Sequence, residues 1–300
     1  MTNFTNQYVP SIGLGTYNMS SEEAELTTFH ALKHGYRHID TAAVYRNEDG
    51  VAKGVKTYLN DSDLKREDIF ITTKLWPGGL VKVDRIKDYT GTVKSFEKSL
   101  MRLNLDYIDL YLIHSPHGKT KRLEQWRALV DLKEAGKIKY IGVSNWGINH
   151  LSELKENDLP MPDANQIELH PWSQKPELVK FLRNEKIDII AYSSLVPLST
   201  WRHKDGENSK KTNEMHEIGL SENSPFKILA EKYDVTEAQF LLKWAVQNNY
   251  AVLPKSINIE RVKQNFELNF LIDQSDMEYI TTLDKGDSIT WEYGDPLKVK

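Results

Sequence analysis

Polar residues that can exchange protons follow short apolar runs in the first half of the chain. Asp40, Lys74 and His114 each close such a run, and Tyr45 follows shortly after Asp40. A carboxylate, an ammonium, an imidazole and a phenol are groups that general acid–base chemistry uses. Taken singly, they have structural explanations, such as a buried ion pair for Lys74 with Asp40 or a half-buried aromatic residue for Tyr45. Their repeated placement after apolar runs instead indicates one shared site.

The apolar runs themselves predict eight short β-strands with amphipathic segments between them. Repeated strand–helix alternation favours parallel strands whose faces are covered by helices. Eight units favour an α/β fold of the (β/α)8 TIM-barrel class, while periodicity alone leaves an open doubly wound sheet as an alternative. The predicted strands are Ile12–Thr16, His38–Asp40, Ile69–Lys74, Ile108–His114, Ile141–Ser144, Ala164–Glu168, Ile187–Tyr192 and Ala251–Pro254.

Helix start and stop signals lie between these runs. Ser20 and Ser21 precede Glu22 as N-cap candidates, and Gly35 stands where the first helix would end. The other predicted helices are Asn47–Asn60, Asp84–Leu103, Leu123–Ala135, Asn149–Glu156, Pro176–Lys186, Thr236–Gln247, Glu260–Leu268 and Ser275–Leu283.

In a barrel of this class, chemistry takes place at the carboxyl ends of the strands and in the loops that follow them. Polar side chains are costly inside a dry barrel wall, so their concentration at one end of the strands predicts a site there. Asp40, Lys74 and His114 end the second, third and fourth predicted strands. The later strands contain or lead into Ser144, Asn145, Gln166, Tyr192, Lys255 and Ser256.

Two segments break the alternation. Val196–Phe226 is a long polar stretch, and a loop of that length is either a functional lid or disordered. Asp284–Lys300 contains Trp291 and Tyr293, which are unusual in a frayed terminus. We expect a long loop after the seventh strand and a C-terminal tail that packs over the barrel mouth.

Composition narrows the class of protein further. The 300 residues are expected to form a single barrel domain over residues 1–300, and the net charge of −4 does not suggest nucleic acid or an anionic membrane as a partner. With no cysteine, disulfides and thiolate metal sites are excluded. Residues 1–10 lack an apolar signal core, and no window approaches the ~18–20 apolar residues of a membrane span. We therefore expect a cytoplasmic monomer or weak dimer without a metal.

Seven motifs in order resemble the aldo-keto reductases, and within that family most closely the small fungal reductases. The likeness runs from about Pro10 to Leu283. It implies a (β/α)8 barrel and an NADPH-dependent enzyme that reduces aldehydes or ketones to alcohols by hydride transfer. The motifs are Gly13–Thr16, His38–Ala42 with Tyr45–Glu48, Thr73–Trp76, Ile108–His114, Ile141–Asn145, Asn165–Pro171, and Pro254–Ser256 with Arg261.

The resemblance assigns a catalytic role to each of the four residues introduced first. Tyr45 would be the general acid that protonates the carbonyl oxygen. A free tyrosine has a pKa near ~10, and a neighbouring ammonium lowers it. Lys74 would supply that ammonium, held by Asp40. His114 would donate a hydrogen bond to the same oxygen and steer the substrate.

The resemblance also implies a binding site for NADPH or NADP⁺. Gly13 and Gly15 lack the third glycine of a dinucleotide-binding fingerprint, so a Rossmann site is not predicted. Tyr192 would stack on the nicotinamide, and two cations, Lys255 and Arg261, would bind the 2′-phosphate that distinguishes NADPH from NADH. The implied cofactor-binding residues are Gly15, Thr16, Asp40, Ser144, Asn145, Gln166, Tyr192, Ser193, Leu195, Lys255, Ser256, Ile257, Arg261, Gln264 and Asn265.

Three positions depart from the family pattern. Gln264 stands where an acidic residue is frequent, Ser194 where proline is frequent, and Ser115 where better-known members carry tryptophan. Ser115 would leave a roomier or more polar pocket, so no particular sugar-like substrate is inferred. The implied substrate-binding residues are Tyr17, Val44, Tyr45, Trp76, His114 and Trp291.

Two other functions fit the same residues. In the first, the barrel is an aldolase or isomerase of phosphorylated sugars, in which Lys74 forms a Schiff base while Lys255 and Arg261 bind phosphate. In the second, a reductase scaffold binds the cofactor without useful turnover. The complete set of four catalytic candidates argues against loss of activity.

Overall fold

The computed structural model describes residues 6–81, 83–198, 217, 221, 223–286, 290 and 295–300. Most of Val196–Phe226 and the aromatic residues Trp291 and Tyr293 lie outside the described residues. The predicted lid and the predicted contact of Trp291 with substrate therefore stay predictions.

Eight parallel strands form one sheet in chain order. Ile12 pairs with Val252 in parallel, and the Gly13 amide donates to the Val252 carbonyl at 2.8 Å, so the first and last strands meet. This contact closes the sheet into the predicted (β/α)8 barrel and excludes the open doubly wound alternative. The strands are β1 (Leu14–Gly15), β2 (His38–Asp40), β3 (Phe70–Leu75), β4 (Ile108–Ile113), β5 (Ile138–Ser144), β6 (Ala164–Glu168), β7 (Asp188–Tyr192) and β8 (Ala251–Val252).

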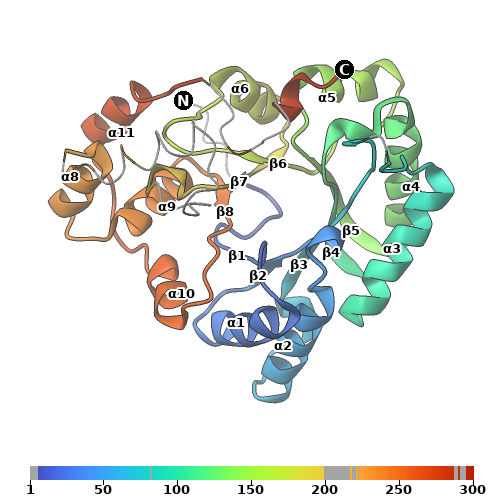
Figure 1. Ribbon diagram of the computed structural model, residues 1–300, viewed down its shortest axis with the longest axis horizontal. Coiled ribbons are helices and arrows are strands. Elements are labelled where there is room, and N and C mark those ends of the chain that lie inside the picture. Colours follow the sequence, from blue (N-terminus) through green and yellow to red (C-terminus); the bar gives the residue numbers. More distant parts are fainter. Residues whose placement is uncertain are drawn as a thin grey trace.

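Helices surround the strands on the outside of the barrel (Figure 1). The first helix begins at its expected signal: Ser20 accepts from the Glu23 amide, and Glu23 accepts from the Ser20 amide in a capping box. The helices are α1 (Ser21–Lys33), α2 (Glu48–Asn60), α3 (Tyr89–Leu103), α4 (Arg122–Glu134), α5 (Ile148–Glu156), α6 (Pro176–Asn184), α8 (Pro225–Lys232), α9 (Glu237–Gln247), α10 (Ile259–Phe266) and α11 (Gln274–Thr281).

Two helix predictions need correction. The helix predicted from Asp84 begins at Tyr89, because the Asp88 side chain caps it by accepting from the Gly91 amide. Asp84 instead lies in the loop before that helix. Helix α8 was not predicted, since it starts inside the polar stretch that the sequence pattern marks as a loop.

The amino end of the barrel is closed by the start of the chain. Asp188, the first residue of β7, accepts from the backbone amides of Gln7, Tyr8 and Val9 at 2.7, 2.8 and 3.0 Å. Val9 packs with Leu110 and other apolar side chains of the strands in a small buried cluster. A larger core lies between the strands and the surrounding helices. The start of the chain therefore covers the amino end of the barrel, opposite the carboxyl ends of the strands where the predicted site residues lie.

The C-terminal tail reaches that carboxyl end. Thr290 donates through its amide and its hydroxyl to the Glu168 carboxylate, at 3.1 and 2.8 Å, where β6 ends. The carbonyl of Val299 bonds the His150 ring of α5 at 2.5 Å. The described part of the tail thus contacts the rim near β6 and α5, and its packing over the barrel mouth stays a prediction.

Candidate active site

A buried ion pair joins the ends of β2 and β3. Lys74 Nζ lies 2.5 Å from Asp40 Oδ1 and donates to the Thr41 carbonyl at 2.8 Å. The second carboxylate oxygen of Asp40 accepts from Gln166 Nε2 at 2.8 Å. Lys74 is fully buried and Asp40 is 3% exposed. The predicted ion pair of Asp40 and Lys74 is therefore formed, and each side chain has more than one polar partner.

Burial shifts the protonation of this pair. It raises the pKa of Asp40 above its ordinary value, and the Lys74 ammonium acts against that rise. Burial likewise lowers the pKa of Lys74, and the Asp40 carboxylate opposes that fall. The two groups are coupled, so the charge on one depends on the charge of the other.

Tyr45 lies near this pair, at the end of a short 3-10 turn, Ala43–Tyr45. Lys74 Nζ is 5.1 Å from the centroid of its ring. The Tyr45 ring also meets the ring of His114 edge-on, with centroids 5.6 Å apart. Asp40, Tyr45, Lys74 and His114, called the tetrad below, therefore form one cluster.

The loop that carries Tyr45 is held by Asn47, to which the sequence pattern assigned no role. Asn47 is fully buried. Its side chain accepts from the Thr41 hydroxyl at 2.8 Å and donates to the carbonyls of Thr16 and Met19 at 2.9 and 3.1 Å. These bonds tie the loop after β2 to the loop after β1. The sequence signals for Asn47 were its place inside the Tyr45–Glu48 motif and at the start of the predicted helix Asn47–Asn60.

His114 follows β4 and is held as a neutral ring. Burial, with a smaller contribution from the Lys74 charge, lowers the pKa of His114 well below its ordinary value. Its Nδ1 is buried and has no hydrogen-bond partner among the described residues. A neutral imidazole can donate one hydrogen bond but does not carry the proton that general acid catalysis would use. His114 is thus suited to orienting a carbonyl oxygen.

Four of the predicted cofactor contacts form a second cluster beside the tetrad. Tyr192 donates from its hydroxyl to Asn145 Oδ1 at 2.7 Å, and Asn145 Nδ2 lies 3.0 Å from the Ser144 hydroxyl. Ser144 donates to the Gln166 carbonyl at 2.9 Å. Asn145 also donates to the His114 carbonyl at 3.1 Å, which links this cluster to the tetrad.

The other predicted cofactor contacts lie around the same rim. Gly15 and Thr16 are buried at the end of β1, and the Thr16 hydroxyl donates to the Asp40 carbonyl at 3.1 Å. Ser193 and Leu195 are partly exposed after β7, and Ser193 has a left-handed backbone with φ 58°. Strained backbone of this kind is common at functional sites.

The predicted phosphate-binding residues flank the start of α10. Lys255, Ile257 and Arg261 are exposed, Ser256 and Gln264 are partly buried, and Asn265 is buried. The Ser256 side chain accepts from the Asn258 amide at 3.1 Å, and Asn258 caps α10 by accepting from the Arg261 amide at 3.1 Å. The Ser256 hydroxyl donates to the Asn258 carbonyl at 3.3 Å, so the two cations and the helix N-terminus are the groups available to an anion.

The predicted substrate walls lie partly around the tetrad. Tyr17 meets Tyr45 edge-on at 5.1 Å between centroids, and Trp76 meets His114 edge-on at 5.7 Å. Tyr17 and Val44 are 40% and 41% exposed, so both can contact a ligand from solution. Trp291 lies outside the described residues.

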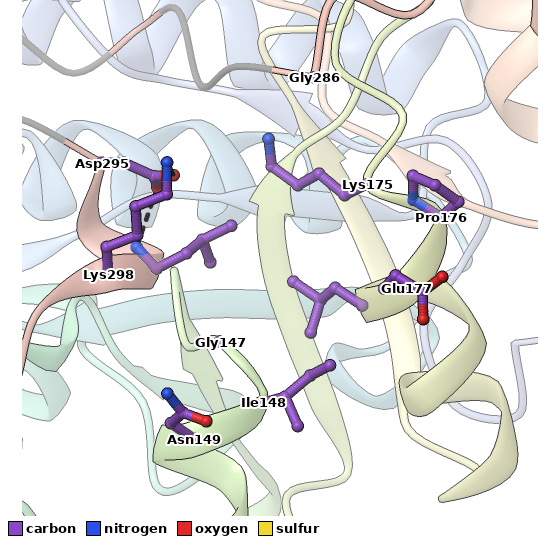
Figure 2. Close-up of a pocket in the computed structure, with 11 residues that line it drawn as sticks. Gly147, Ile148, Asn149, Lys175, Pro176, Glu177, Gly286, Asp295 and Lys298 are labelled. Carbon is purple, nitrogen blue, oxygen red and sulfur yellow. Dashed lines mark hydrogen bonds and ion pairs between the residues drawn. The ribbon is translucent and has the colours of Figure 1, made fainter.

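A pocket of about 350 Å³ lies elsewhere, between the starts of α5 and α6 and the C-terminal residues (Figure 2). Lys175 and Lys298 line it together with Glu177 and Asp295, so its charges balance. No member of the tetrad lines this pocket. The described residues also contain no group of three or more side chains suited to a metal ion, and none of their helices is long and apolar enough to cross a membrane.

Comparison with known proteins identifies the family of the chain. The model of the aldo/keto reductase family matches residues 11–285. The glyoxal reductase of Bacillus subtilis is 38% identical over 283 residues, which cover 94% of this chain and 91% of the relative. The methylglyoxal reductase DkgA of Yersinia pestis is 36% identical over 285 residues, which cover 94% and 92%. The glycerol 2-dehydrogenase (NADP(+)) of Saccharomyces cerevisiae, a fungal relative, is 34% identical over 310 residues, which cover 94% and 89%.

A solved structure gives the same result. The aldo-keto reductase of Bombyx mori in complex with NADP superposes with a TM-score of 0.81 at 29% identity, and the match covers 96% of this chain and 95% of the other. A (β/α)8 barrel with acid–base residues at its carboxyl end thus defines the class of protein. The chain belongs to the aldo/keto reductase family and is an oxidoreductase that reduces carbonyl groups.

Proposed function

We propose that this chain uses NADPH to reduce the aldehyde group of small α-dicarbonyl compounds, with Tyr45 as the proton donor. The observation that carries the proposal is the position of Lys74, buried against Asp40 and 5.1 Å from the Tyr45 ring. The substrate class is supported by the relatives that are named glyoxal and methylglyoxal reductases. Both substrates are short, which suits a site whose walls are partly exposed.

The Tyr45 hydroxyl gives its proton to the carbonyl oxygen as the carbonyl group is reduced to an alcohol. The O–H bond of the phenol breaks, a new O–H bond forms on the substrate, and the Lys74 ammonium favours the phenolate left behind. His114 donates a hydrogen bond to the same oxygen and fixes its position. Solvent then returns a proton to Tyr45.

The residues present fit NADPH by their chemistry. When bound, the nicotinamide supplies the hydride that reaches the carbonyl carbon. Gln166 has its amide nitrogen committed to Asp40, which leaves its carbonyl end to accept from a carboxamide. Tyr192 offers a ring for stacking, and the exposed cations Lys255 and Arg261 offer charge to the 2′-phosphate.

The bonds of Lys74 oppose a Schiff-base mechanism. Such a lysine must present a free amine to substrate, whereas Lys74 is fully buried and donates to two acceptors, Asp40 and the Thr41 carbonyl. The cytoplasmic location, the single domain over residues 1–300 and the monomer or weak dimer stay predictions. Size-exclusion chromatography with light scattering would test the last of these.

The decisive experiment compares the wild type with Tyr45→Phe. Wild-type protein should oxidise NADPH in the presence of glyoxal or methylglyoxal. The variant should bind NADPH with unchanged affinity, measured by quenching of cofactor fluorescence, and lose about 10²–10⁴-fold in kcat. Full turnover in the variant would show that Tyr45 is not the acid, and wild-type activity on longer aldehydes alone would overturn the substrate class.

A further inference from the structure

Asp84 makes a contact that none of the catalytic or cofactor-binding roles explains. It lies in the loop between β3 and α3, and its Oδ2 accepts from Trp76 Nε1 at 2.7 Å. Trp76 follows the end of β3, two residues after Lys74. The carboxylate therefore holds one end of an aromatic ring that stands beside the tetrad.

The other side of the same indole faces His114. The two rings meet at 83° with centroids 5.7 Å apart. A partly buried indole has one polar atom, and its N–H needs an acceptor, so the position of the acceptor fixes the rotation of the ring. Asp84 thus determines which face of Trp76 is turned toward the position where His114 would meet a carbonyl.

The loop is built to hold Asp84 in place. The Asp84 carbonyl accepts from the Gly79 amide at 3.0 Å. Lys87 Nζ donates to the Trp76 carbonyl at 2.6 Å, and Gln125 of α4 donates to the carbonyls of Pro77 and Lys87 at 3.1 and 2.8 Å. Hydrogen bonds therefore join the two ends of the loop, Trp76–Pro77 and Lys87, to each other and to α4.

A glycine closes the same loop. Gly78 has φ +82°, and a Cβ added there would lie 2.2 Å from the Arg85 carbonyl. Only glycine allows the chain to fold back this closely, which brings Asp84 within reach of the indole.

We propose that Asp84 is a positioning residue that sets substrate selectivity by holding the Trp76 indole against His114. The proposal rests on the proposed reduction of α-dicarbonyls and names the part of the substrate that Asp84 affects. A carbonyl compound with a bulky second substituent must pack that substituent on the pocket wall, whereas glyoxal has almost none. Loss of the bond between Asp84 and the Trp76 indole therefore weakens the binding of bulky substrates and changes the binding of glyoxal little.

The test compares Asp84→Leu with Asp84→Asn, using NADPH oxidation with phenylglyoxal and with glyoxal. Leucine removes the acceptor, and asparagine keeps one oxygen that can accept from the indole. We expect Asp84→Leu to raise the KM for phenylglyoxal roughly tenfold with little change in kcat, since one bond to a charged acceptor is lost. We expect Asp84→Asn to restore most of the wild-type KM. Asp63→Leu, at an exposed aspartate outside this loop, is the control for the loss of a surface carboxylate.

A second pair of variants separates positioning from a general loss of stability. Trp76→Phe has no indole N–H, so adding Asp84→Leu to it should change the KM for phenylglyoxal by less than about twofold. Equal KM values for Asp84→Leu and Asp84→Asn, or an undiminished effect of Asp84→Leu in the Trp76→Phe background, would overturn the role of Asp84. Wild-type protein inactive on both dicarbonyls would instead overturn the proposed function.

Discussion

The buried pair of Asp40 and Lys74 should respond to substitution in a way that depends on which partner is removed. Asp40→Asn keeps the shape of the side chain and removes its charge. Lys74 is fully buried, and its remaining oxygen partner from the backbone is the Thr41 carbonyl at 2.8 Å. The variant therefore leaves a buried ammonium without the carboxylate that contacts it, and the more distant Glu48 is the negative charge that still acts on it.

The size of the effect follows from the protonation of Lys74. Removing one partner of a buried pair costs about 3–5 kcal/mol of the free energy of unfolding. Lys74 can avoid this cost by losing its proton. For a lysine with an ordinary pKa of ~10.4, deprotonation at about pH 7 costs about 4.6 kcal/mol. We therefore expect Asp40→Asn to lose about 3–5 kcal/mol near neutral pH.

The direction of the pH dependence is a sharper test. In Asp40→Asn the folded state prefers neutral Lys74, so the unfolded chain binds more protons and the loss shrinks by about 1.4 kcal/mol for each pH unit above neutrality. Lys74→Met leaves the Asp40 carboxylate buried, which raises its pKa in the folded state. The folded state then binds more protons, and this variant recovers stability as the pH falls.

Urea unfolding of both variants, measured as the difference from wild type at several pH values, tests this reasoning. The double variant Asp40→Asn/Lys74→Met removes both charges and should be more stable than either single variant near neutral pH. A loss below about 1 kcal/mol in both single variants, or differences from wild type that do not change with pH, would refute the account of a coupled buried pair.

Three further outcomes are expected. Arg261→Ala should weaken binding of NADPH by roughly 10–100-fold and leave NADH unchanged in fluorescence titration, because one charge-assisted phosphate contact is lost; equal losses for both cofactors would remove this role. Asp188→Asn should lower the free energy of unfolding by about 2–3 kcal/mol in urea, since its carboxylate accepts from three backbone amides; an unchanged midpoint would contradict this. Burial lowers the pKa of His38 to about 3, so its ring stays neutral in the folded state below the ordinary pKa of ~6.5, whereas it takes up a proton in the unfolded chain. The free energy of unfolding therefore decreases as the pH decreases below ~6.5. His38→Asn should reduce that slope by about 1.4 kcal/mol per pH unit between about pH 6 and pH 4, and an unchanged slope would contradict the neutral ring.

Much of the barrel could be predicted because its strands are local, apolar and regularly spaced. His38–Asp40 and Ala164–Glu168 agree with β2 and β6 residue for residue. The carboxyl-end rule then brought Asp40, Lys74 and His114 together without any knowledge of contacts. Tyr45 was different, because it lies in a loop after β2 and its inclusion depended on the family resemblance.

The contacts that could not be predicted all depend on how loops fold in three dimensions. Asp84 was placed inside a helix by helical periodicity, whereas its carboxylate is committed to the Trp76 indole. Asn47 bonds residues of two different loops, so its role depends on their approach. Neither pattern is visible in a linear sequence, since both partners are set by tertiary packing and not by spacing.

Gln166 joins the tetrad to the proposed cofactor site. A change at Gln166 should therefore affect both acid catalysis and cofactor binding. Its amide nitrogen donates to Asp40 Oδ2 at 2.8 Å, while the other oxygen of that carboxylate binds Lys74 at 2.5 Å. Under the proposed function, the carbonyl end of Gln166 accepts from the carboxamide of the nicotinamide. Since a single planar amide makes both contacts, cofactor bound at one end holds the carboxylate at the other. The orientation of Asp40, and through it the ammonium beside Tyr45, therefore depends on the same side chain that recognises the cofactor.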